Sequence, residues 1–241
     1  SAALQTTYPA TIKGIQDVEV RPKVSGFITK VFVHEGQTVS AGQALFSIDS
    51  ETYQAAVRSA AAAVNTAKAQ ANTAKLTYQN NKKLYDSKII GEYELSTAAN
   101  GYATAKAQVA QAEAALASAR EQLAWCTVTS PSAGVVGSLP FKVGALVSAS
   151  GQALTTISNI STMEVFFSLS ESQILSMSKT SGSVQAAIAA FPAVKLQLAD
   201  GSIYDHPGKV VKMSGVIDAT SGSISLIAHF ANPEKLLKSG G

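Results

Sequence analysis

Residue types that build disulfides and metal sites are scarce in this chain of 241 residues. Cys126 is its single cysteine, so an internal disulfide and a Cys-based metal cluster are both excluded. Because Cys126 ends a helical stretch, we expect a buried structural thiol there. The histidines His34, His206 and His229 are isolated in sequence and lack metal-ligand spacing, so we expect them in surface or strand positions.

Charge and long apolar runs are scarce as well. Charged residues make up 15% of the chain and its net charge is +3, which is too small to argue for a nucleic-acid partner without an aromatic-interleaved basic patch. No apolar run reaches the roughly 18 residues of a membrane span. No signal peptide begins at Ser1, so we expect any export signal or lipid anchor to lie outside the printed sequence.

Proline is absent from residues 50–125, and glycine occurs there only at Gly91 and Gly101. Ala, Gln, Lys and Glu fill this stretch and favour helix, because they lose little rotamer freedom in it. Apolar residues recur with a seven-residue repeat typical of coiled coils. The first half of the stretch carries Val57, Val64, Ala71, Tyr78 and Tyr85, with Ala60, Ala67 and Ala74 between them. The second half carries Leu95, Tyr102, Val109, Leu116 and Leu123, with Ala98, Ala105, Ala112 and Ala119 between them.

The repeat breaks once, over residues 86–91, so we predict two helices folded back on each other. Each has about 35 residues, which makes the hairpin roughly 50 Å long. Its alanine-rich seam predicts a slender, closely packed rod. The alternative is an ordinary helical domain in which a third helix covers the pair.

A short β-type motif occurs on both sides of this stretch, in residues 18–49 and 127–159. The spacing from Gly26 to Gly36 equals that from Gly134 to Gly144, and the sequence Gly-Gln-Ala-Leu begins at both Gly42 and Gly151. Two copies of one motif, neither large enough to bury a core alone, predict two halves that close a single β-core.

Residues 160–241 form a third unit in which short β-type runs alternate with turns. We predict strands at 163–169, 184–188, 194–198, 207–213 and 223–230. A short helix is expected at 170–178 with Ser170 as its cap, a hairpin turn at Asp200-Gly201, and a loop at 218–222. This pattern favours a small β-barrel, which we expect the N-terminal strand to join and whose closing strand we expect beyond Gly241.

The predicted fold class is therefore α+β, in an elongated multidomain chain. A long antiparallel coiled-coil hairpin (50–126) is inserted in a split β-domain (18–49 with 127–159). A small β-barrel domain (1–17 with 160–241) follows.

The split β-domain resembles the biotinyl/lipoyl domain. The residues that carry the resemblance are Gly26, Ile28, Val31, Val33, Glu35, Gly36, Val39, Gly42 and Leu45. True carrier domains bear an acceptor lysine at the turn between the halves, and here the helical stretch occupies that place. The chain as a whole resembles a periplasmic adaptor, or membrane fusion protein, of a resistance-nodulation-division tripartite efflux pump, within the HlyD-like family. The segments VRPKVSG from Val20, TSPSAG from Thr129, DATSGSISL from Asp218 and FANPEKLL from Phe230 carry that resemblance.

The resemblance implies a non-enzymatic coupler with no cofactor. It implies an inner-membrane transporter and an outer-membrane channel as partners, and self-association into a ring. It also implies a periplasmic location, with an N-terminal anchor and a membrane-proximal domain that we expect to lie outside the printed sequence. In many members the hairpin tip carries an Arg-x3-Leu-x6-Ser pattern, whose register here gives Asn80, Leu84 and Gly91, so only the leucine is kept. Ile89 and Ile90 either anchor a partner helix end or plug the seam of the hairpin itself.

Two alternatives belong to other classes. A biotin or lipoyl carrier subunit would need an exposed acceptor lysine at the β-turn. A heavy-metal efflux adaptor would bind its cargo directly, but Met163, Met177 and Met213 lie far apart in sequence, so we expect them in the core.

Overall fold

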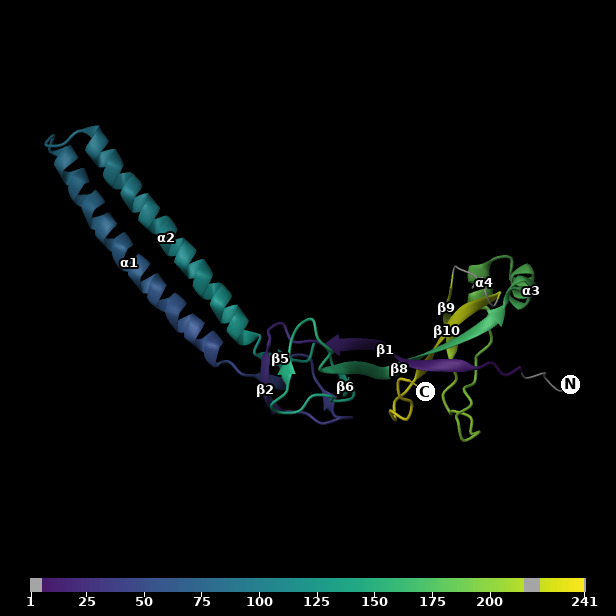
Figure 1. The fold of residues 1–241 in the computed structure, drawn as a ribbon. Coiled ribbons are helices and arrows are strands. Elements are labelled where there is room, and N and C mark those ends of the chain that lie inside the picture. Colours follow the sequence, from purple (N-terminus) through teal and green to yellow (C-terminus); the bar gives the residue numbers. More distant parts are fainter. Residues whose placement is uncertain (1–5, 215–221, 241) are drawn as a thin grey trace.

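The computed structural model of the chain describes residues 6–214 and 222–240. The molecule is elongated: a helical hairpin extends from one end of a β-structure whose other end carries two short helices (Figure 1). The helices are α1 (Glu51–Asp86), α2 (Glu92–Ala124), α3 (Glu171–Ser181) and α4 (Val184–Ala189). The strands are β1 (Ala10–Val20), β2 (Gly26–Val31), β3 (Thr38–Val39), β4 (Ala44–Ile48), β5 (Thr127–Thr129), β6 (Gly134–Val136), β7 (Leu146–Val147), β8 (Thr155–Ser170), β9 (Lys209–Met213) and β10 (Ser223–Ala231).

The hairpin consists of α1, with 36 residues, and α2, with 33. At 1.5 Å per residue each helix is about 50 Å long. Val64, Ala67 and Ala105 are buried between the helices, and Tyr78 stacks on Tyr102 with ring centroids 6.2 Å apart. These residues all belong to the predicted seam. Because α3 and α4 lie at the opposite end of the molecule, the expected two-helix rod is confirmed and the compact helical domain is wrong (Figure 1).

One seam position differs from the prediction. The Tyr85 side chain is 40% exposed, whereas Leu84 is half-buried. The chain turns back after Asp86, and the Ile89 N–H donates to the Leu84 carbonyl at 2.9 Å. The end of α1 is therefore covered on the Leu84 side rather than on the Tyr85 side.

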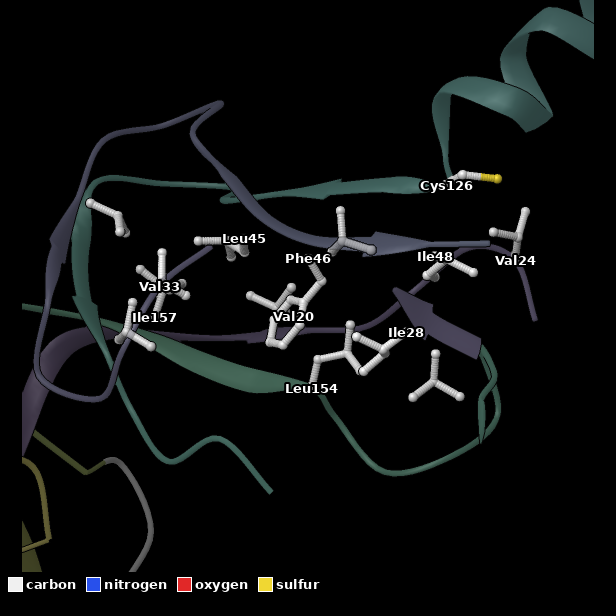
Figure 2. Packing of buried hydrophobic residues seen from close by; sticks show 14 residues of the cluster. Val20, Val24, Ile28, Val33, Leu45, Phe46, Ile48, Cys126, Leu154 and Ile157 are labelled. Carbon is white, nitrogen blue, oxygen red and sulfur yellow. The ribbon is translucent and has the colours of Figure 1, made fainter. Parts of the chain in front are cut away.

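The two halves of the lipoyl-like domain share one hydrophobic core, which we call the first core (Figure 2). Residues 18–49 contribute Val20, Val24, Ile28, Val33, Val39, Leu45, Phe46 and Ile48, and the second half contributes Cys126, Val128, Val136, Val147, Leu154 and Ile157. A four-stranded sheet in the order β5-β4-β2-β7 interleaves strands of both halves. The split lipoyl-like domain predicted from the sequence is thus confirmed.

The equivalent glycines of the two halves have equivalent roles. A Cβ on Gly26 would lie 2.6 Å from the Ile48 Cγ2, and one on Gly134 would lie 2.7 Å from the Ser158 carbonyl oxygen, so both permit a close approach of strands. Gly36 and Gly144 have φ angles of 79° and 91°, which only glycine adopts without strain. The repeat seen in the sequence is therefore a repeat of backbone geometry.

The hairpin is joined firmly to the first core. Tyr53 of α1 and Trp125 at the end of α2 both pack against that core. The Tyr53 hydroxyl donates to the Ser25 carbonyl at 3.1 Å, and the Lys23 ammonium lies 5.3 Å from the centroid of the Trp125 ring. These contacts fix the base of each helix to the same β-domain.

Strands β1 and β8 pair antiparallel from Val20 opposite Thr155 to Ala10 opposite Phe167. They run as a ribbon from the first core to a second one around β8, β9 and β10. The register shifts between Gly14 and Gln16, where the chain bulges. The two cores are therefore linked by continuous strands rather than by a loop.

The second core lies on the sheet formed by β1, β8, β10 and β9 and includes residues of helix α3 and of the segment 194–204. Its buried residues are Ile160, Met163, Val165, Phe167, Leu169, Ile174, Leu196, Tyr204, Val210, Ile224, Leu226, Ala228, Phe230 and Leu237. The Asp200-Gly201 turn is present, since Gly201 has a φ of 86° and the Leu198 N–H donates to the Ser202 carbonyl at 2.8 Å. The expected loop at 218–222 lies mostly outside the described residues.

Two predicted strands of this unit are wrong. Residues 184–188 lie in helix α4, because the Ser183 side chain caps it by accepting from the Ala186 N–H at 3.0 Å. Residues 194–198 form no continuous strand and make only isolated bridges, from Val194 to Gly208 and from Gln197 to Ile203. In both stretches tertiary context outweighed the β-propensity of single residues.

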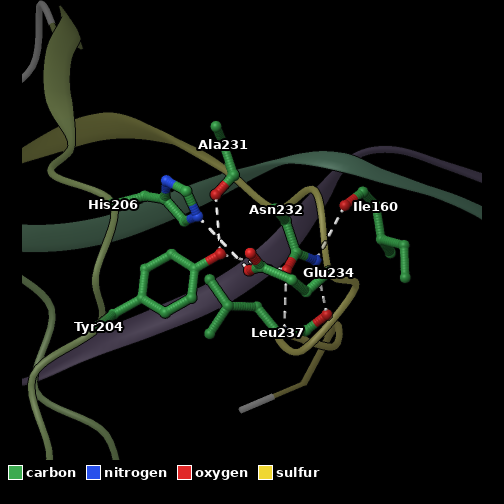
Figure 3. A network of polar contacts seen from close by, with 7 residues as sticks. All are labelled: Ile160, Tyr204, His206, Ala231, Asn232, Glu234 and Leu237. Atoms are coloured by element: carbon green, nitrogen blue, oxygen red, sulfur yellow. Dashed lines mark hydrogen bonds and ion pairs between the residues drawn. The ribbon is translucent and has the colours of Figure 1, made fainter.

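After β10 the chain returns to the bulge in the ribbon, where Asn232 is buried (Figure 3). Its Nδ2 donates to the carbonyls of Ile160 and Leu237, both at 2.9 Å, and its Oδ1 accepts from the Leu237 N–H at 3.1 Å. Within the same turn the Lys235 ammonium donates to the Thr38 hydroxyl of β3 at 3.2 Å. The turn at 232–237 therefore contacts both β-cores, and we call it the brace.

Candidate docking site at the hairpin tip

The tip of the hairpin is a compact turn with a defined hydrogen-bond pattern. The Ile89 N–H donates to the Leu84 carbonyl at 2.9 Å, and the Lys88 N–H donates to the Tyr85 carbonyl at 2.8 Å. This pair of bonds is the Schellman motif, which places one residue in the left-handed region. Lys88 occupies that position, with a φ of 59°. The motif fixes the direction in which the chain leaves α1.

This turn leaves apolar side chains in solvent. Ile89 is 68% exposed, so it does not plug the seam of the hairpin, whereas Ile90 is half-buried. Asn80 and Gly91 are exposed, and Leu84 is half-buried. Of the predicted tip residues, Asn80, Ile89 and Gly91 are therefore exposed, and Leu84 and Ile90 are partly covered.

Helix α2 begins without a side-chain cap. Gly91 is its N-cap residue, in an extended conformation with φ −86° and ψ 174°. Glu92 and Glu94 lie in the first turn, where their charges interact favourably with the helix dipole. A Cβ on Gly91 would lie 3.0 Å from the Glu94 Oε2. The start of α2 is therefore stabilised by charge and not by a capping hydroxyl.

A groove of about 510 Å³ lies beside the tip, between the two helices. Its lining residues are Ala74, Thr77, Asn81, Tyr93, Glu94, Thr97, Ala98 and Gly101. Tyr93 is 80% exposed at one end of it. The sequence analysis missed both the groove and Tyr93. The available signal was an aromatic residue in the first turn of a helix that does not fit the seven-residue repeat.

The cysteine and two of the histidines lie in environments that suit a structural role. Cys126 is buried, and that burial, followed by the nearby Asp49 carboxylate, raises the pKa of its thiol. His229 contacts Glu164 at 3.1 Å and His206 contacts Glu234 at 3.4 Å. Over residues 6–214 and 222–240 there is no group of three or more His, Cys, Asp or Glu side chains with metal-binding geometry.

His34 is exposed, as expected for a surface histidine. Met163 is buried and Met213 packs against the second core, so these two methionines lie in core positions. None of the helices in the described part of the chain has the length and apolar character needed to cross a bilayer.

The family comparison agrees with this architecture. The barrel-sandwich hybrid domain of RND membrane fusion proteins matches residues 16–159, and the β-barrel domain of the same proteins matches residues 162–240. A hairpin inserted in a split lipoyl-like domain and followed by a β-barrel defines the adaptor class of membrane fusion proteins. The chain belongs to the membrane fusion proteins of the resistance-nodulation-division (RND) type.

Two proteins are similar to the chain over nearly its whole length. The chain is 34% identical to the membrane fusion protein MtrC of Neisseria gonorrhoeae, over 100% of this chain and 59% of MtrC. It is 33% identical to the multidrug efflux pump subunit AcrA of Escherichia coli K12, over 98% of this chain and 60% of AcrA. The chain thus spans about three fifths of the length of these relatives.

Solved structures share the fold. A chimera of MacA with the α-hairpin domain of Pseudomonas aeruginosa MexA matches with a TM-score of 0.67 and 28% identity, over 96% of this chain and 74% of the chimera. ZneB of Cupriavidus metallidurans matches with a TM-score of 0.60 and 23% identity, over 97% of this chain and 93% of ZneB. At that identity the likeness to ZneB concerns the fold alone.

Proposed function

We propose that the protein is a periplasmic adaptor that links an inner-membrane efflux transporter to an outer-membrane channel. The observation that carries the proposal is an exposed apolar tip, Ile89 and Tyr93, at the end of a two-helix rod about 50 Å long. Such a rod holds a contact site far from the β-cores. Membership in the RND membrane fusion family supports this role.

In this proposal the tip binds the channel. Ile89 and Tyr93 are apolar contacts of the kind that anchor interfaces, and Asn80, Leu84, Ile90 and Gly91 surround them. The defined Schellman turn supports tight binding, because a preorganised loop loses little entropy when it docks. No bond is made or broken at this site, so the role is mechanical and not catalytic.

The β-domains have the complementary role. We propose that they contact the transporter and neighbouring copies of the adaptor, which form a ring in the assembled pump. An N-terminal anchor in the inner membrane would hold the adaptor at the transporter. The lipoyl-like domain is a scaffold here, since the hairpin occupies the turn that bears the acceptor lysine in a carrier.

We propose organic compounds as the exported cargo. The relatives that support this are an antibiotic efflux pump periplasmic linker, ArpA, and a toluene efflux pump periplasmic linker, TtgA, both of Pseudomonas putida and both 32% identical to the chain. The cargo is a property of the whole pump. A drug-resistance assay in a host that lacks its own adaptor would therefore test the cargo proposal.

A cysteine crosslink tests tip docking. Ile89→Cys is expected to crosslink to an outer-membrane channel in cells, whereas Leu76→Cys is not. Leu76 is a matched control because it is 59% exposed on α1 but lies below the tip. Deletion of residues 80–95 is expected to abolish export while the rest of the chain folds. Retention of drug resistance in that deletion strain would show that the tip has no docking role.

A further inference from the structure

Several polar side chains around the groove beside the tip have no partner within the described parts of the chain. Asn81 is half-buried in the α1 wall, and its side-chain amide forms no hydrogen bond there. On α2 the Tyr93 and Thr97 hydroxyls are equally unpaired, and the Glu94 carboxylate forms neither a hydrogen bond nor an ion pair. Unpaired polar groups of both helices thus border one groove of about 510 Å³.

The floor of the groove is apolar and is built from small residues. Ala74 and Ala98 line it from the seam, where both are half-buried. Thr77 adds a methyl group, since its hydroxyl donates to the Thr73 carbonyl at 3.1 Å. A Cβ on Gly101 would meet no atom within 4 Å, so the α2 wall is open at that point. The groove therefore has room for an apolar group of some size.

The groove has the dimensions of a small-molecule site. The Tyr78–Tyr102 stack sets the antiparallel register, in which Asn81 of α1 lies within one residue of the height of Ala98. Along the rod axis the groove extends about 20 Å from Ala74 to Tyr93, at 1.5 Å per residue. Its volume falls in the range of sites that accept drug-sized ligands, in which an apolar floor and a few polar groups are typical.

Charge decides which ligand fits. Of the lining residues Glu94 alone is charged, and its Oε2 faces Gly91, where a Cβ would lie 3.0 Å away. Lys82, which follows the α1 wall in sequence, pairs with Asp86 at 3.3 Å and not with Glu94. Tyr93 beside it is 80% exposed, and the face of an aromatic ring attracts cations. One carboxylate supplies too few ligands for a metal ion, so an organic cation is favoured.

We propose that this groove is a binding site for amphipathic organic cations, which join an apolar body to a quaternary or protonated nitrogen. The body would lie on Ala98 and Thr77. The cationic end would contact the Tyr93 ring and the Glu94 carboxylate, and the Asn81 amide would hydrogen-bond to polar groups of the ligand. The inference adds a ligand site to the rod, and this site does not depend on the docking role proposed for the tip.

A matched pair of ligands tests the site. The 241-residue chain is titrated at neutral pH with N-methylphenanthridinium and with phenanthridine, which has the same three fused rings but no charge. Equilibrium dialysis gives both dissociation constants. The cation is expected to bind about three- to tenfold more tightly, because only the cation gains one exposed ion pair and one cation–π contact.

A carboxylate variant tests the charge contact. Glu94→Gln is expected to weaken binding of the cation about two- to fivefold, as one exposed ion pair does, and to leave binding of the neutral compound unchanged. Glu92→Gln is the matched control, since Glu92 lies in the same first turn of α2 but outside the groove lining. It should leave both affinities at the parent values.

A filling variant tests the place of binding. Gly101→Leu puts a side chain into the open wall and is expected to remove most of the affinity for both compounds. Leucine favours helix more than glycine does, so this variant keeps the hairpin folded. Ala103→Leu adds the same side chain two residues further along α2, outside the groove lining, and should bind like the parent chain.

The outcomes that overturn the proposal are distinct. Equal affinities for the two compounds, equal losses in Glu94→Gln and Glu92→Gln, or full binding by Gly101→Leu would each contradict a cation site in this groove. The tip crosslink of Ile89→Cys is measured separately in cells. If that crosslink forms while the cation does not bind, the ligand site is wrong and the adaptor role stands; the reverse result removes the docking role and keeps the site.

Discussion

At the scale of single residues, two positions in the tip turn lack the residue type that would stabilise their conformation best. Lys88 adopts a left-handed conformation that glycine would adopt without strain, and Gly91 caps α2 without a hydroxyl. Lys88 directly precedes the exposed Ile89, and Gly91 follows it by two residues. Such locally unfavourable choices are expected at functional sites, and they make the tip a good place for single-residue tests.

Lys88→Gly is expected to stabilise the end of the hairpin by about 0.5–1 kcal/mol, since it relieves the left-handed strain. Hydrogen exchange of the last amides of α1 measures the effect. Lys88→Ala removes the same side chain but keeps the Cβ, so its exchange rates should match those of the parent chain. Equal protection in the glycine and alanine variants would contradict the strain argument.

Gly91→Ser is expected to protect the first turn of α2, because a serine oxygen accepts from the free N–H groups there. Gly91→Ala limits the backbone equally but supplies no acceptor. The serine variant should exceed the alanine variant by about 1 kcal/mol in the free energy of local opening. Amide exchange at Tyr93 and Glu94 provides the measurement.

The Cys126 thiol predicts a pH effect. Because burial raises its pKa in the folded state, the unfolded chain loses the thiol proton first as pH rises. Its contribution to stability is therefore complete below the unfolded pKa of about 8.5 and is lost as pH rises through the folded pKa. Cys126→Ala should flatten the decline in unfolding midpoint above about pH 8.5. Thr127→Ala, an exposed neighbour, should leave the slope unchanged.

At the scale of elements, the hairpin depends on small seam residues. Ala67 and Ala105 are buried between the helices together with Val64, and most other seam positions are only partly covered. A two-helix rod has little volume to fill, so close backbone approach takes the place of large side chains. This explains why so thin an element remains regular over its whole length.

Ala105→Leu is expected to push the helices apart and cost about 1–3 kcal/mol, as overpacking does in tight cores. Ala103→Leu adds the same side chain at an exposed position of the same helix and should change stability by less than about 0.5 kcal/mol. Thermal unfolding followed by far-ultraviolet circular dichroism compares the two. A similar loss in both variants would mean that the seam is not tightly packed.

The secondary-structure elements also differ in how well the sequence alone predicts them. The seam was predictable from residue types, since the seven-residue repeat reports directly on which face is buried. The exposure of Tyr85 was not predictable, because the direction of the turn after Asp86 decides which residue is covered. Helix α4 was missed because a single cap, Ser183, outweighed apparent β-propensity. The groove beside Tyr93 depends on two helices at once, so no local pattern indicates it.

At the scale of the whole molecule, the two β-cores are joined by the β1–β8 ribbon and by the brace. The ribbon bulges between Gly14 and Gln16, and the segment just after the brace covers that point: the Gly14 N–H donates to the Ser239 hydroxyl at 2.7 Å. Contacts between residues so far apart in sequence cannot be read from periodicity. The proposed linking role would need a defined angle between the two β-domains, and this junction is where that angle is set.

Asn232 is the residue on which that junction depends most. Its side chain pairs with the Ile160 carbonyl of the ribbon and with both backbone groups of Leu237. Asn232→Ala would leave three buried backbone groups without these partners, at a cost of about 2–4 kcal/mol in the free energy of unfolding. Glu234→Gln is the matched control in the same turn, because its exposed contact with His206 is worth less than about 1 kcal/mol.

Urea unfolding gives the loss of stability, and exchange of the Leu237 amide reports on the bond to Asn232 itself. In Asn232→Ala that amide should lose protection before the strands of the second core do, since the brace can open while β8 and β10 remain paired. Small-angle scattering should then detect a broader range of molecular lengths, because the ribbon alone twists and bends more easily than the ribbon with its brace. If the alanine variant keeps the amide protected and the length distribution narrow, the ribbon by itself fixes the angle between the cores.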